Sequence, residues 1–142
     1  MSLTAIHPPE RSRPGSRPAQ PVAALAGLEP RAHAVIAALR CIAAGLADCP
    51  SVSRLVDDGL GCARGEGLVR VFVFARVLAH EARRPLAVGW PGCGALTALE
   101  RAVACALDPR GGRDDLAGVL GAPPGRALGL ALGSLRVGVT MG

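Results

Sequence analysis

LVRVFVFARVLAHEARRPLAVGWPGCGALTALERAVACAL, residues 68–107, is the stretch that decides the fold. It contains the most apolar run of the chain, the basic pair Arg83 and Arg84, the single tryptophan Trp90 and the turn around Cys93. A proline-rich segment and two helix-like patterns precede it, and a glycine-rich closure follows it. The conformation of this stretch therefore sets the class of the whole domain.

Its first part is compatible with two secondary structures. Valine alternates with other residues over 69–74, which is the pattern of a strand. Helical spacing fits equally well, with apolar residues at Leu68, Phe72, Ala75, Leu78, Ala79 and Ala82. The polar residues favour the helix, since Glu66 and Arg70 form an i,i+4 pair. Four others gather on one helical side: Arg76, His80, Arg83 and Arg84. We predict a helix over 66–83, with a strand as the alternative.

The second part predicts a turn and a clear helix start. Pro85 ends the preceding helix, and we expect a short extended segment from Leu86 to Trp90. Thr97 and Glu100 have the spacing of a capping box, in which each side chain bonds a backbone N–H at the helix start. We predict a helix from this box to Asp108.

Two helices are predicted before this stretch. Pro30 begins the first, because proline is favoured at the first helical position. Arg40 is interpreted as a polar residue that flanks its apolar stripe. The second helix is shorter, with Asp48 as its N-cap and with Gly59 and Gly61 as its stop.

Two more helices are predicted after it, over 114–120 and 127–136. Residues 1–28 are rich in proline and arginine and offer little to bury, which predicts a disordered tail. The sequence therefore predicts an all-α protein, with one compact domain of five or six short helices over residues 29–142.

Composition limits the kinds of molecule that this protein is expected to bind. The net charge is +5, and all 16 basic residues are arginine, which is typical of a GC-rich bacterial genome. The arginines are spread along the chain and aromatic residues are few, so nucleic-acid binding is disfavoured. The longest uncharged run, residues 85–99, is shorter than the roughly 20 residues of a spanning helix. We expect no membrane span.

Cysteine usage suggests a reducing compartment. The five cysteines are odd in number and form no CxxC pair, which argues against a disulfide framework. No signal peptide is recognisable at the N-terminus. We therefore expect a cytoplasmic protein.

Cys93 is the first candidate for a functional residue. It lies in a Pro-Gly-Cys-Gly turn four residues before Thr97, where a helix N-terminus and nearby cations would activate a thiol. A metal site could combine His80, Cys93, Cys49 and Cys62. Zinc sites normally show paired close ligands, and this chain has none. The alternative is a small residue tolerated in a tight turn, and no cofactor is predicted.

A second candidate is an anion-binding or ligand-binding cluster of Arg76, His80, Arg83 and Arg84. Arginine pairs with phosphate or carboxylate groups through two hydrogen bonds. The alternative is a solvated helix end, where cations are favoured by the helix dipole. No sequence motif of a catalytic nucleophile is present, so the sequence favours a non-enzymatic protein over an enzyme.

The chain resembles a small family of alphaproteobacterial proteins of sphingomonad type. The resemblance rests on Leu39-Arg40, on the segment Ala44 to Asp48, on Arg83 to Leu86 and, most strongly, on Cys93 to Glu100. It covers roughly residues 31–120. Family members have several cysteines in that turn, whereas this chain keeps Cys93 alone. The resemblance implies a domain and no activity.

These observations lead to one main functional hypothesis. The C-terminal half is apolar, rich in Gly and Ala and poor in charge, so it could bury a face against a protein partner or a second copy. We expect a non-enzymatic accessory or regulatory protein. The alternatives are a metal or redox protein centred on Cys93, and weak anion or nucleic-acid binding through Arg76, Arg83 and Arg84.

Overall fold

The computed structural model describes residues 6–7, 25–108 and 114–137. Within them the fold is all-α, as predicted, and the helices pack around one main hydrophobic core. The six helices are α1 (Pro30–Ala43), α2 (Pro50–Leu60), α3 (Glu66–Glu81), α4 (Ala98–Leu107), α5 (Asp114–Leu120) and α6 (Arg126–Val137). A single 3-10 turn, η1 (Leu25–Gly27), precedes α1.

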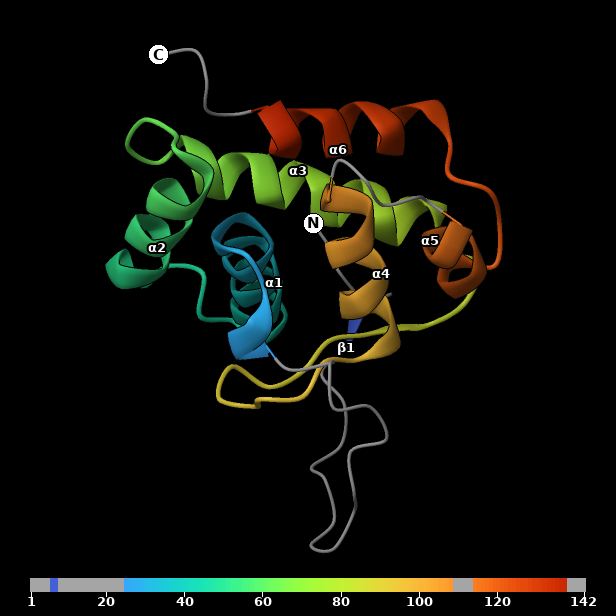
Figure 1. Cartoon of the computed structure of the whole chain (residues 1–142), viewed down its shortest axis with the longest axis horizontal. Coiled ribbons are helices and arrows are strands. Elements are labelled where there is room, and N and C mark those ends of the chain that lie inside the picture. The colour runs from blue at the N-terminus through green and yellow to red at the C-terminus, as the bar shows by residue number, and fades with distance from the viewer. Residues whose placement is uncertain (1–5, 8–24, 109–113, 138–142) are drawn as a thin grey trace, which may run out of the picture.

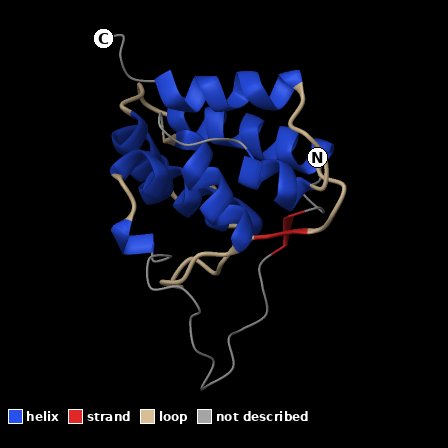
Figure 2. Cartoon of the chain, turned by 45° about the vertical axis from the view of Figure 1, so that its right-hand side comes forward, coloured by secondary structure: helices blue, strands red, loops and turns tan. Residues whose placement is uncertain are grey.

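The helices form two levels. Figure 1 shows α6 lying along α3 across the top of the view, with α1 and α4 below α3. Helix α2 packs against both α1 and α3, and α5 packs against α4. Figure 2 shows two strands at one edge, where β1 (Ile6–His7) pairs in parallel with β2 (Leu86–Ala87).

The ambiguity at residues 68–74 is resolved in favour of the helix. Val71, Phe74, Ala75 and Leu78 are fully buried and have helical spacing, so α3 presents one continuous face to the core. A strand would place alternate residues on opposite faces and expose half of this set.

The helix ends earlier than predicted, at Glu81 and not at residue 83. Ala82 is extended, and the Arg83 N–H donates to the carbonyl of Leu120, 2.8 Å away, which ties the chain to α5. Arg83 and Arg84 therefore do not share a helical face with Arg76 and His80, which corrects the sequence-based interpretation. The extended segment predicted from Leu86 to Trp90 contains a strand only at Leu86–Ala87.

Two predictions about α2 were wrong. Its N-cap is Cys49 and not Asp48, and no side chain caps this helix end. Gly59 does not stop the helix but lies inside it, where α2 packs closely against α1. A Cβ atom at Gly59 would lie 2.3 Å from the Cβ of Ala34. Gly61 ends the helix in the left-handed conformation, with φ of 66°.

The helix ends are held by side chains from neighbouring helices. Asp57 of α2 accepts hydrogen bonds from the N–H groups of Gly65 and Gly67, at 2.7 and 2.8 Å, and so caps α3. Glu81 of α3 accepts from Gly125 and Leu128 and caps α6. Which helix Asp57 caps depends on how the helices pack, and so no local sequence pattern identifies this role.

The predicted disordered tail lies mostly outside the described residues, where it stays a prediction. Its last part is ordered: Leu25 and Leu28 pack against Ile36 and Leu96. The Leu25 N–H also donates to the carbonyl of Gly94 at 2.8 Å. Earlier in the same segment, Ile6–His7 pair with β2.

The contact at Gly59 predicts a specific loss of stability. Gly59→Ala should lower the free energy of unfolding by about 1–3 kcal/mol, because overpacking forces α1 and α2 apart. Urea unfolding followed by circular dichroism measures this loss.

Gly118→Ala is the matched control for Gly59→Ala. Gly118 lies in α5 with nothing within 4 Å of its would-be Cβ. Alanine there should stabilise the fold by about 0.5–1 kcal/mol. Equal shifts of the two variants in the same direction would contradict the close approach at Gly59.

Candidate functional site

A buried ion pair joins α1 to α4 beneath the turn that contains Cys93. The Arg40 Nε lies 2.8 Å from Glu100 Oε2, and Arg40 Nη2 lies 2.9 Å from Oε1, so the pair is bidentate. Both side chains have 0% exposure. Arg40 was interpreted from the sequence as a flanking polar residue, and this was wrong.

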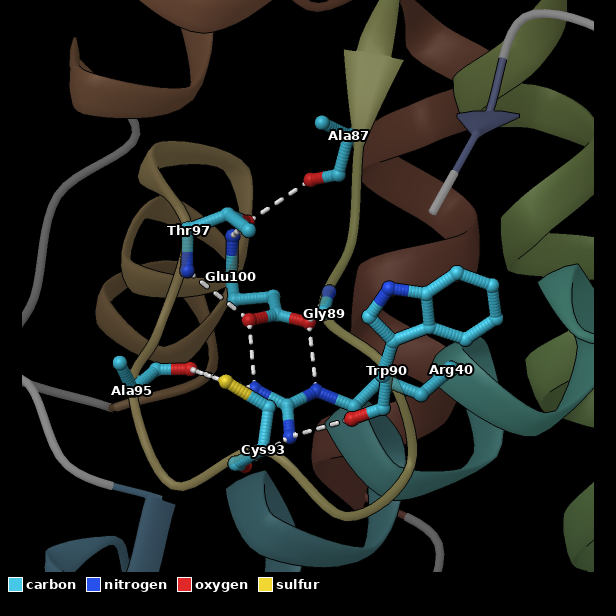
Figure 3. A network of polar contacts seen from close by, with 8 residues as sticks. All are labelled: Arg40, Ala87, Gly89, Trp90, Cys93, Ala95, Thr97 and Glu100. Atoms are coloured by element: carbon cyan, nitrogen blue, oxygen red, sulfur yellow. Dashed lines mark hydrogen bonds and ion pairs between the residues drawn. The ribbon is translucent and has the colours of Figure 1, made fainter. Parts of the chain in front are cut away.

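The guanidinium also binds the turn itself. Arg40 Nη1 donates to the carbonyls of Trp90, at 3.2 Å, and Cys93, at 2.5 Å, and Nη2 donates to Ala95 at 2.7 Å (Figure 3). All five N–H groups of the arginine are thus used. The arginine holds the turn in one conformation.

Glu100 is saturated in the same way. Besides Arg40, it accepts from the Gly89 N–H at 2.7 Å and from the Thr97 N–H at 2.9 Å. The Thr97 hydroxyl accepts from the Glu100 N–H at 3.2 Å, which completes the predicted capping box. The same hydroxyl donates to the carbonyl of Ala87, so the cap also anchors β2.

Glycine is required at position 89. A Cβ there would lie 2.7 Å from Nη2 and 2.8 Å from the central carbon of the Arg40 guanidinium. Only a residue without a side chain lets the backbone approach the arginine this closely.

The charge on Arg40 is firmly held. Hydrogen bonding to Glu100 raises the pKa of Arg40 above its ordinary value and outweighs the opposing effect of burial. Because every donor and acceptor of the pair already has a protein partner, the pair presents no free group to a ligand. Its role is to position the turn, on which Trp90 is exposed.

Cys93, the first candidate, lies within this turn. Its backbone carbonyl contacts Arg40, whereas its Sγ faces the carbonyl of Ala95 at 3.7 Å (Figure 3). The neighbouring guanidinium is already paired with Glu100. The guanidinium beside Cys93 is therefore directed at backbone carbonyls and at a carboxylate.

The hypothetical metal ligands are not brought together. The described residues contain no group of three or more His, Cys, Asp or Glu side chains able to hold a metal ion. This geometry gives no support to a site of His80, Cys93, Cys49 and Cys62.

The structure brings together two of the four residues in the second candidate cluster. Arg76 and His80 line a cavity of about 360 Å³ between α3 and α6, together with Val73, Val77 and Ala127. Neither polar side chain has a hydrogen-bond or ion-pair partner in the described part of the chain. We call this cavity the α3–α6 groove.

The other two members of that cluster lie elsewhere. Arg84 donates to the carbonyl of Gly118 at 3.2 Å and lines a separate cavity beside Arg101, Asp114 and Asp115. The Arg83 backbone is bonded to α5. The chain leaves α3 at Ala82, so the helical periodicity that suggested a single cluster does not apply beyond that residue.

The thiols differ in their surroundings. Cys49 is exposed, and its Sγ lies 3.1 Å from the hydroxyl of Ser51, which lowers the pKa of the Cys49 thiol. Burial raises the pKa values of Cys41 and Cys62. The sequence analysis named Cys49 only as one ligand of the hypothetical metal site, and its position one residue before a helix-starting proline was a usable signal for its exposed setting.

Comparisons with known proteins do not add a relative: no family model, curated protein or solved structure matches the chain. Among the described helices, none is both long and apolar enough to cross a membrane. The resemblance to the alphaproteobacterial family stays a prediction.

Removal of one partner from the buried pair should be severely destabilising. Arg40→Met leaves Glu100 buried without its countercharge and should cost about 3–5 kcal/mol in chemical denaturation. Arg40→Met combined with Glu100→Gln should recover part of that loss. Arg101→Met, on the exposed side of α4, is the control and should change stability by less than about 0.5 kcal/mol. A single Arg40→Met variant as stable as the control would contradict the role of the pair.

Thiol chemistry provides a second test. A lowered pKa increases the thiolate fraction at neutral pH, so iodoacetamide should modify Cys49 first and Cys41 and Cys62 last. Peptide mass spectrometry over a time course measures the order. Ser51→Ala should slow Cys49 specifically, since it removes the hydrogen bond. Modification of a buried cysteine ahead of Cys49 would count against this assignment.

Proposed function

We propose that this chain is a non-enzymatic accessory or regulatory protein that acts through protein contacts. The contact site in this proposal is the α3–α6 surface. It comprises the exposed apolar residues Val69, Val73 and Leu130 together with the groove residues Arg76, Val77, His80 and Ala127.

One observation carries the proposal: apolar side chains are exposed on α3 and α6, and residues of both helices line one groove. The exposed fractions are 60% for Val69, 50% for Val73 and 67% for Leu130. Val69, Val73 and Val77 follow one another at i,i+4 spacing on α3, and Ala127 lines the same groove from α6. A contiguous apolar patch with a polar rim is typical of a protein-interaction site.

The interior supports a scaffold and not a catalytic centre. The buried polar side chains of the described fold, Arg40 and Glu100, bond to each other and to the backbone. A catalytic pair would need at least one group directed at a substrate. Cytoplasmic location is part of the proposal, supported by the odd number of cysteines, and so is the bacterial origin that the arginine-rich composition suggests.

Site-specific photo-crosslinking in the source organism tests the proposal. A photo-reactive residue placed at Val73 should yield a discrete crosslinked protein, because this position lies on the contact surface. The same residue at Leu55, which is exposed on α2, is the matched control. Equal yields at both positions, or no product at Val73, would overturn the proposal.

A further inference from the structure

We infer that the α3–α6 surface accepts an amphipathic helix with acidic side chains. This inference rests on the proposed function and adds the chemistry of the partner. It is argued from the position of the groove between two helices, from Arg76, which lines it and has no partner among the described residues, and from the contacts already made by the two acids of α3.

The shape fits a helix laid along two others. Arg70 of α3 donates to the carbonyl of Ser134 of α6 at 3.0 Å, whereas Glu81 bonds the start of α6. Helices α3 and α6 therefore run antiparallel, and Figure 1 shows them lying alongside each other. Residues of both helices line the groove. Its cavity of about 360 Å³ can receive an anchoring apolar side chain. Helix-in-groove recognition uses anchors of this kind at i, i+3 or i+4, and i+7.

Arg76 is the charged side chain in the lining of the groove, and no acidic side chain among the described residues lines it. The free polar side chains on the groove are Arg76 and His80, and Arg126 is exposed at the start of α6. The two acids of α3 are already engaged: Glu66 pairs with Arg70, and Glu81 caps α6. Helix α6 has no acidic residue. Complementarity therefore calls for a partner that supplies carboxylates.

The same charge disfavours a second copy of this chain. In a two-fold dimer the same patch lies on both sides of the interface. The Arg76 of each copy would then meet a groove in which no described acidic side chain is present to pair with it. A flat anionic membrane would satisfy the charge, but it would not place an anchor in the concave groove.

Peptide binding to the full chain tests the inference. The probe is a fluorescein-labelled amphipathic helical peptide with leucines at i, i+3 and i+7 and glutamates beside them. The matched peptide carries lysine at every glutamate position. Fluorescence anisotropy should show saturable binding of the glutamate peptide and at least about tenfold weaker binding of the lysine peptide.

Variants of the chain locate the site. Arg76→Glu should weaken binding of the glutamate peptide by about tenfold or more and improve binding of the lysine peptide. Val73→Asp should abolish binding of both. Arg54→Glu, on α2 and beside a different cavity, makes the same charge change and should leave binding unchanged. Circular dichroism of each variant confirms that it is folded.

Each other outcome overturns the inference and identifies what replaces it. Equal binding of the two peptides, or insensitivity to Arg76→Glu, removes the acidic partner but leaves the surface as a contact site. Concentration-dependent dimerisation in light scattering, lost in Val73→Asp, identifies a second copy. Binding only to phosphatidylserine vesicles identifies a membrane surface. Failure of every probe together with no crosslink at Val73 removes the proposed function as well.

Discussion

The bidentate pair of Arg40 and Glu100 is the interaction on which the rest of the structure depends. It joins α1 to α4 inside an apolar core, where two unpaired charges would be strongly destabilising. The desolvation is tolerated because five donors and two carboxylate oxygens all find partners on the protein. Three hydrogen bonds from Arg40 hold the turn between β2 and α4, so the shape of the turn follows from that of the guanidinium.

The helix ends are likewise stabilised by polar side chains that bond to other parts of the fold. Side chains on one helix satisfy the terminal backbone groups of another: Asp57 caps α3, Glu81 caps α6, and Arg31 and Arg136 bond the carbonyls of Leu135 and Ala106. The core is mainly Ala, Leu and Val, with Phe74 its largest buried apolar side chain. Apolar packing is not directional, so these polar contacts help to specify which helix ends lie together. Many of the polar residues that resemble site candidates therefore have structural partners.

The residues that stabilise the fold are thus different from those of the proposed contact surface. The Cys93 turn is organised from within by Arg40, and its groups are directed at the fold. On the α3–α6 surface, Arg76 and His80 have no partner among the described residues, and apolar side chains beside them are exposed. This contrast is the reason why the proposed contact site is the α3–α6 surface and not the Cys93 turn.

The sequence by itself determined the helices, because their signals are local: periodicity, Pro30 and Pro50 at helix starts, and the box of Thr97 and Glu100. Only the tertiary structure decided what the polar residues do. The sequence offered one weak signal for Arg40, a lone charge beside an apolar stripe, but its partner is 60 residues away. The roles of Gly59 and Asp57, and the pairing of α3 with α6, likewise depend on which helices pack together. Contacts between segments distant in the chain leave no periodic pattern in the sequence. The contact of Arg83 with α5 is one of these, and so the structure was needed to show that Arg83 and Arg84 lie apart from Arg76 and His80.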